Sequence, residues 1–182
     1  NETWSLQVFR TTGKIYEATA AQMFHVPEDS IAKGKPNYPL RQRGKVATLA
    51  LGYEGGIGAL IRMNALRMGI PEDDLPKIRD AWRKANPHIV HLWKEIENAA
   101  FRAAAYKKST LVQGKLLFTI EDKNNYFMTI QLPSGRKLFY NCPHLKRDEN
   151  GNPKLYYWGQ NQTTKKWQEI GTYAGKLTEN CT

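Results

Sequence analysis

The chain has 182 residues, 41% of them hydrophobic and five of them Trp, a composition that excludes an intrinsically disordered protein. Its formal net charge of +10 and sequence pI near 9.6 favour a polyanionic partner, nucleic acid first, although scattered lysines on any basic protein would give the same total. No apolar run approaches the roughly 18 residues of a membrane span. The two cysteines, Cys142 and Cys181, lie far apart without metal-ligand spacing, so we expect no disulfide framework, and a single bridge between them stays open.

The first 108 residues carry the periodicity of amphipathic helices. We expect helices over residues 1–10, 14–24, 40–53, 57–67, 72–85 and 87–107, with a loop over 25–39. Asn86 is the expected N-cap of the last helix and Pro87 its first residue. Gly44 lies inside the helix 40–53, at a cost of about 1 kcal/mol relative to Ala. That position indicates the close approach of either a packed neighbour or a ligand.

After Ser109, β-branched and aromatic residues alternate with polar ones and turn signals recur. We expect strands over 115–121, 126–132, 136–141, 154–159 and 167–173, joined by turns at Asp122–Asn125, Ser134–Gly135, Asn150–Gly151 and Asn161–Lys165. Residues 174–182 predict the start of another helix. The predicted fold class is therefore α+β, with a helical segment over 1–108 and an antiparallel, hairpin-rich segment over 109–182.

Four side chains recur every four residues along the helix 40–53. Arg41, Lys45, Leu49 and Tyr53 would share one face of it. One interpretation is an ordinary surface helix, with Leu49 and Tyr53 in the core and the two cations in solvent. The other is a nucleotide lying along the helix, because Arg and Lys suit phosphates and a Tyr ring can stack on a base.

Other possible sites are more simply explained as structure. His88 and His91 share a helix face, but the sequence places no third metal ligand beside them. We expect the carboxylate pairs Asp73–Asp74 and Asp148–Glu149 on the solvated surface, and Cys142-Pro143-His144 in a turn. The sequence contains no Walker loop and no Rossmann fingerprint.

Two stretches, in order along the chain, resemble family A (polymerase-I-like) DNA polymerases. RQRGKVATLALGYEGG is similar to the nucleotide-binding fingers helix of their shortened phage-encoded branch, and KIYEATAAQMFHVP resembles the helix that precedes it. These stretches cover about residues 14 to 58. A weaker similarity continues through NPHIVHLW and LPSGRKLFYNCP to TYAGKLTENCT. Residues 1–108 would then be a fingers-like segment, and 109–182 a β-rich segment that adjoins the palm.

The resemblance implies roles for five residues. Arg41 and Lys45 would contact the triphosphate of an incoming dNTP, and Lys45 would also donate a proton to the departing pyrophosphate. Tyr53 would pack beside the template base. Leu49 stands where the family usually has an aromatic residue, and Tyr16 where it often has a phosphate-contacting His. The departure at Leu49 bears on sugar discrimination and not on phosphate binding, and the departure at Tyr16 replaces a possible cation by a phenol.

The resemblance also implies what the chain lacks. Family members hold two Mg²⁺ ions with palm carboxylates on strands that would lie before residue 1 and after residue 182. We therefore expect a segment of a longer phage or prophage polymerase, located in the cytoplasm of a bacterial cell and inactive alone, whose partners are primer–template DNA, dNTP and the rest of the polymerase. The chain begins at Asn1 without Met, which fits that expectation. The alternative is a stand-alone, non-catalytic nucleic-acid-binding module.

Overall fold

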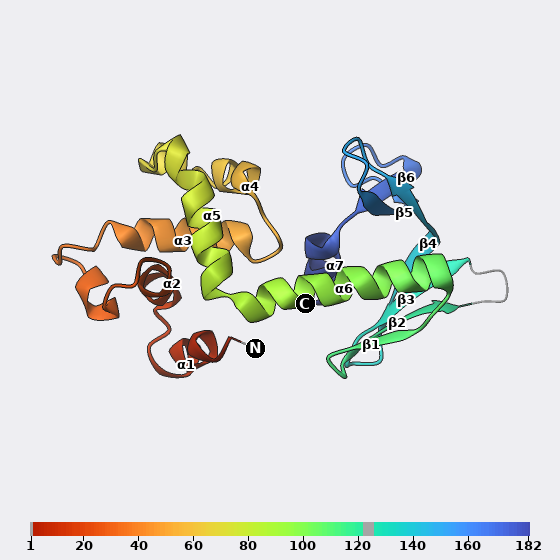
Figure 1. Cartoon of the computed structure of the whole chain (residues 1–182), viewed down its shortest axis with the longest axis horizontal. Coiled ribbons are helices and arrows are strands. Elements are labelled where there is room, and N and C mark those ends of the chain that lie inside the picture. Colours follow the sequence, from red (N-terminus) through yellow and green to blue (C-terminus); the bar gives the residue numbers. More distant parts are fainter. Residues whose placement is uncertain (1, 122–125) are drawn as a thin grey trace. The chain divides into compact units, whose positions relative to one another are not determined.

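The computed structural model of the chain describes residues 2–121 and 126–182. It contains two compact units, Asn1–Leu92 and Trp93–Thr182 (Figure 1). The mixed α+β class expected from the sequence is confirmed. The change of sequence character near Ser109 follows the end of helix α6, whereas the two units divide within that helix.

The first unit is helical. Its elements are α1 (Thr3–Thr11), α2 (Ile15–Phe24), η1 (Glu28–Ile31), α3 (Leu40–Leu51), α4 (Ile57–Arg62), η2 (Leu66–Met68), η3 (Glu72–Asp74), α5 (Leu75–Ala85) and the beginning of α6 (Pro87–Tyr106). The helix expected over 57–67 is wrong in its second half. Asn64 takes a φ of 61°, in the left-handed region, and this break separates α4 from the short η2.

Helices α2 and α3 pack unusually closely, at Gly44. A Cβ added at Gly44 would lie 2.2 Å from the Tyr16 carbonyl oxygen and 3.0 Å from the Cβ of Ala20. One turn later, the Thr48 hydroxyl donates a hydrogen bond of 3.1 Å to that of Thr19. The neighbour that requires a glycine at position 44 is therefore the backbone of α2.

The start of α6 is capped from a distance. The Glu2 carboxylate accepts hydrogen bonds from the backbone N–H groups of His88, at 2.7 Å, and Ile89, at 3.1 Å. Pro87 is the first helical residue, as predicted. Asn86 occupies the N-cap position, but its side chain instead donates to the Trp82 carbonyl at the end of α5. The prediction that the Asn86 side chain caps this helix was therefore wrong. The cap is the Glu2 carboxylate, whose negative charge also matches the positive end of the helix dipole.

The second unit is a six-stranded antiparallel sheet in chain order, followed by a helix. Its elements are β1 (Thr110–Val112), β2 (Leu116–Glu121), β3 (Phe127–Gln131), β4 (Lys137–Arg147), β5 (Pro153–Gln160), β6 (Trp167–Thr172) and α7 (Ala174–Cys181). Five strands and the final helix match the sequence prediction, and β1 was missed. The expected turn Asp122–Asn125 lies outside the described residues.

Strand β4 is longer than predicted because it continues through a bulge. The register between β4 and β5 shifts between Asn141 and His144, and Cys142 takes a φ of 48°. The turn expected at Cys142-Pro143-His144 was therefore wrong, since these residues stay in the strand. The predicted hairpin at Asn150–Gly151 is confirmed: Gly151 has a φ of 79° and donates to the Asp148 carbonyl.

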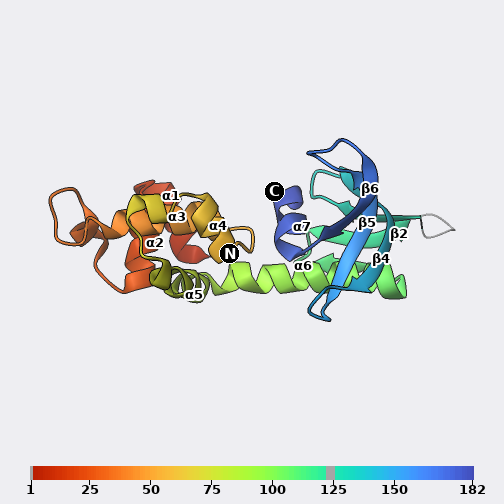
Figure 2. The same ribbon diagram turned by 90° about the horizontal axis from the view of Figure 1, so that it is seen from above.

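One face of the sheet forms the core of the second unit. Phe118, Met128, Ile130, Tyr140 and Leu155 alternate inward along β2 to β5 and are buried. Helix α7 packs against this face (Figure 2). Its Asn180 donates a hydrogen bond of 3.0 Å to the Tyr140 hydroxyl. We call this the inner face and the opposite one the outer face.

No helix in the described part of the chain is long and apolar enough to cross a membrane. Cys142 and Cys181 are both free thiols, so no bridge joins them. Burial raises the pKa of the Cys181 thiol to about 11. Within residues 2–121 and 126–182, no three His, Cys, Asp or Glu side chains gather closely enough to hold a metal ion.

Candidate nucleotide-binding site

The structure brings three of the five predicted site residues together. The guanidinium carbon of Arg41 lies 5.6 Å from the centre of the Tyr16 ring, and the Lys45 ammonium lies 6.0 Å from the same centre. Both distances allow a cation–π interaction. The contact depends on Gly44, which lets α3 approach the backbone of α2 at Tyr16 itself. Local packing thus places two cations over one phenol ring.

A carboxylate that sequence reasoning missed completes this cluster. Glu17 on α2 accepts a hydrogen bond of 2.7 Å from the Nε of Arg41, and both side chains are partly exposed. This hydrogen bond is the main reason that the pKa of Arg41 is raised above its usual value. Glu17 follows Tyr16 directly in the sequence, so once the two helices are paired its proximity to Arg41 could have been anticipated. The pair orients the guanidinium and offsets part of the local positive charge.

Leu49 and Tyr53 continue the same face of α3 toward its end and just beyond it. Their exposed fractions are 49% and 44%, so neither belongs to the core. The surface-helix interpretation, which buried both, was wrong on this point. At 1.5 Å per residue, Leu49 lies about 12 Å along the helix from Arg41. A cationic end and an exposed apolar end therefore share one helix face.

The turn after α3 is fixed by backbone contacts. A Cβ at Gly55 would lie 1.9 Å from the Ala50 carbonyl oxygen, so only glycine fits there. Glu54 takes a φ of 60°, in the left-handed region that favours glycine. Gly55 therefore serves a tight turn at the end of α3.

Other charged residues near α3 have structural partners. Arg43 forms an ion pair of 3.1 Å with Asp74, whose carboxylate also accepts from Lys77 at 3.2 Å. The sequence interpretation of Asp74 as a merely solvated carboxylate was wrong, because this residue ties α3 to the start of α5. Arg43 therefore points away from the cluster around Tyr16.

A hollow of about 600 Å³ lies beside the cluster. Its lining carries both charges, from the cations Lys14, Lys33 and Arg41 and the carboxylates Glu17, Glu28 and Asp29. Such a mixed lining suits a ligand that carries both phosphates and hydroxyl groups better than one that carries phosphates alone. The loop 25–39 contributes part of this lining, a role that its sequence did not indicate.

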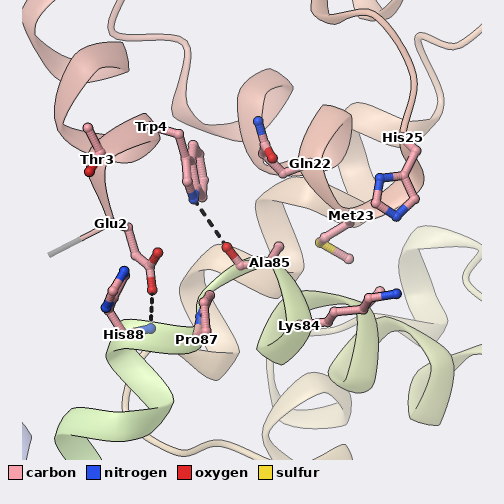
Figure 3. Close-up of a pocket in the computed structure, with 11 residues that line it drawn as sticks. Glu2, Thr3, Trp4, Gln22, Met23, His25, Lys84, Ala85, Pro87 and His88 are labelled. Carbon is pink, nitrogen blue, oxygen red and sulfur yellow. Dashed lines mark hydrogen bonds between the residues drawn. The ribbon is translucent and has the colours of Figure 1, made fainter.

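A second hollow, of about 610 Å³, lies under α1 and has a structural role (Figure 3). The Trp4 indole donates a hydrogen bond of 3.2 Å to the Ala85 carbonyl, and Glu2 binds the backbone of His88. The imidazoles of His25 and His88 lie at opposite ends of this pocket. These contacts anchor α1 to the α5–α6 junction.

Comparison with known proteins identifies a relative of this chain. The chain is 51% identical over 180 residues to a protein described as a DNA polymerase, from Bacillus phage SP02. The match covers 98% of this chain and so runs through both units, but the chain spans only 27% of the length of that relative. No protein-family model matches the chain, and no solved structure matches it.

Proposed function

We propose that this chain is the nucleotide-binding, fingers-containing segment of a phage-type family A DNA-directed DNA polymerase. The observation that carries the proposal is the identity of 51% to a phage DNA polymerase, extending over both units. The clustering of Arg41, Lys45 and Tyr16 supports it, because these residues come from the two stretches that resemble the polymerase motifs. The partners would be primer–template DNA, a dNTP and the rest of the polymerase, in a bacterial cytoplasm.

In this proposal the dNTP lies along α3. Its triphosphate sits at the cationic end and its base at the exposed end near Leu49 and Tyr53. Glu17 holds the Nε of Arg41, which turns the terminal nitrogens of the guanidinium toward the phosphates. In the parent polymerase, the primer 3′-oxygen would bond to the α-phosphate as the bond between the α- and β-phosphates breaks, and the ammonium of Lys45 would donate a proton to the departing pyrophosphate.

The metal chemistry of such a polymerase does not fit the residues described here. In this part of the chain no three carboxylate, His or Cys side chains come together. We place the Mg²⁺ ligands in other parts of the parent protein and assign no metal-dependent step to this segment. The isolated chain is then expected to bind a dNTP without extending a primer, and templated extension by it would contradict this part of the proposal.

The test is a dNTP titration of the 182-residue chain and three variants. Lys45→Ala and Arg41→Ala should each weaken binding about tenfold or more, because each removes a charge-assisted contact to phosphate. Arg79→Ala is the matched control, since Arg79 is also paired with a carboxylate, at 2.7 Å, and is similarly exposed. Equal affinities for all four proteins, or no dNTP binding by the parent chain, would overturn the assignment of the site.

The net charge of +10 favours one alternative, a non-catalytic nucleic-acid-binding module. Such a module would bind DNA with a steep dependence on salt, as the polymerase segment also would. It would differ in showing no dNTP binding that depends on Lys45. The same titration therefore separates the two functions.

A further inference from the structure

The outer face of the sheet carries large aromatic side chains on neighbouring strands. The register sets Asn141 of β4 opposite Trp158 of β5, and Trp158 opposite Glu169 of β6. Trp167, two residues before Glu169, is therefore a diagonal neighbour of Trp158. Phe139, two residues before Asn141, lies on the same face of β4.

These rings are open to solvent instead of packed. The exposed fractions of Phe139 and Trp167 are 59% and 62%, and Trp158 is also exposed. Phe139 meets Phe127 of β3 edge to face, with ring centres 5.8 Å apart. Aromatic side chains this large and this exposed on one face indicate a binding surface.

Lysines lie among the aromatics on the same face. Lys146 of β4 and Lys154 of β5 are directly opposite each other. Their ammonium groups lie 5.6 Å and 5.8 Å from the centre of the Tyr156 ring. The His144 ring stacks on Tyr156 from the neighbouring strand. Two cations thus flank one aromatic ring, next to the exposed Trp158.

Glu169 and Glu121, two carboxylates on this face, hold their neighbours in place. Glu169 accepts hydrogen bonds from Lys146, at 2.6 Å, and from His144, at 2.8 Å. These bonds, that of Lys146 first, lower the pKa of Glu169. Glu121 pairs with Lys137. The described part of this face therefore has organised cations and exposed rings, and Glu169 and Glu121 are already bonded to basic groups.

We propose that the outer face of the sheet binds single-stranded DNA, with bases stacked on Phe139, Trp158 and Trp167 and phosphates beside Lys146 and Lys154. Residues two apart on a strand lie about 6.6 Å apart, and the diagonal neighbours about 7–8 Å, spacings that let successive unpaired bases reach successive rings. A paired base keeps its face inside the duplex, so stacking selects for single strands. The choice of DNA over RNA rests on the proposed polymerase function. The position of the site is inferred independently, from the exposed rings and lysines of the outer face.

The test is the binding of labelled dT20, of a 20-base-pair duplex and of rU20 to the 182-residue chain. Phe139→Ala and Trp167→Ala should each weaken dT20 binding roughly 5- to 100-fold, the range expected for loss of one stacked base. Tyr106→Ala is the matched control, because Tyr106 is 70% exposed but lies on α6. Trp167→Phe should restore most of the affinity, which separates stacking from a folding defect.

The charge component has its own measurement. Lys154→Ala should reduce the slope of log K against log salt by about 0.7, the loss of one phosphate contact on a single strand. Lys94→Ala, an exposed lysine on α6, should leave the slope unchanged. dT20 should quench the fluorescence of the exposed Trp158 and Trp167. It should not quench that of Trp82 and Trp93, because these two side chains are buried.

Several results would overturn the inference. They are tighter binding of the duplex than of dT20, tighter binding of rU20, no binding of dT20, or dT20 affinity that Phe139→Ala and Trp167→Ala leave unchanged. Self-association that these variants abolish, without any effect on DNA binding, would instead make the face a protein interface. Phe139→Ala and Trp167→Ala should not alter dNTP affinity, and Lys45→Ala should not alter dT20 affinity. Failure of one proposal is therefore distinguishable from failure of the other.

Discussion

The contact between α2 and α3 in the first unit and the core of the sheet in the second are packed in opposite ways. In the first unit, α2 and α3 approach closely because Gly44 has no side chain and lies against the backbone of Tyr16. The small residues Ala20 and Ala47 on these helices are also buried. In the second unit, the inner face of the sheet is filled by large side chains such as Phe118 and Tyr140. Added atoms should therefore disrupt the contact between α2 and α3, and removed atoms the core of the sheet.

This difference also bears on the two candidate sites. Close helix packing in the first unit places Tyr16 under the cations of α3, so its site depends on backbone proximity. In the second unit the alternation of strands sends large residues to both faces, and one set remains exposed. Four predictions, from the largest expected effect to the smallest, test this contrast.

Removing atoms from the core of the sheet should have the largest effect. Phe118→Ala is expected to lower the free energy of unfolding by about 3–5 kcal/mol, because Phe118 is fully buried and the cavity cannot collapse completely. Urea denaturation monitored by hydrogen exchange of strand amides measures this loss. Phe139→Ala, on the outer face, is the matched control and should cost far less. A similar loss for both variants would contradict the distinction between the two faces.

A buried phenol should make the second unit sensitive to alkali. Burial raises the pKa of Tyr140 from 10.0 to about 12. The unfolded chain therefore loses this proton first, so the contribution is fully present below pH 10 and is lost as the pH rises to 12. The loss amounts to about 2–3 kcal/mol for two pKa units. Tyr140→Phe should flatten the fall in unfolding free energy between pH 10 and 12, and an unchanged profile would show that Tyr140 is not its source.

Adding one methyl group should disrupt the contact between α2 and α3. Gly44→Ala is expected to cost about 1–3 kcal/mol, because the new Cβ would overlap a backbone oxygen that cannot rotate away. Gly56→Ala is the control, since nothing lies within 4 Å of a Cβ there and its φ is −111°. Thermal unfolding of the two variants measures the difference. Equal stability of Gly44→Ala and Gly56→Ala would contradict a close contact between α2 and α3 at Gly44.

Loss of the distant cap on α6 should have the smallest effect. Glu2→Ala is expected to cost about 1 kcal/mol, because two backbone N–H groups lose a charged acceptor. Exchange of the His88 and Ile89 amides should accelerate most. Glu179→Ala removes only an exposed pair with Lys176 and should stay within about 0.5 kcal/mol of the parent. Unchanged exchange at His88 and Ile89 would contradict the capping role of Glu2.

Local patterns predicted most of the elements, and long-range contacts account for what was missed. Helical periodicity predicted α3, and Gly44 correctly indicated a close approach within it. Strand β1 escaped because it has three residues, and its pairing with β2 defines it. The extension of β4 escaped because Pro143 suggests a turn, whereas pairing with β5 continues across the bulge.

The site followed the same rule. The four-residue spacing from Arg41 to Tyr53 was visible in the sequence, and the structure leaves its apolar end exposed. Glu17 was missed because its partner, Arg41, is 24 positions away on another helix. The cap on α6 was missed because Glu2 is 86 positions from His88. Sequence spacing describes one element at a time, and these side chains acquire their roles only when elements meet.

The most direct test of the proposed function is to map where a nucleotide binds. We would cross-link a photoreactive dATP analogue to the 182-residue chain and identify the modified peptides by mass spectrometry, with excess unlabelled dATP as competitor. The account predicts competable labelling within residues 39–58, near Tyr53, and its loss in Lys45→Ala. Competable labelling confined to the sheet, or labelling that Lys45→Ala leaves intact, would contradict the assignment of α3 as the nucleotide-binding helix.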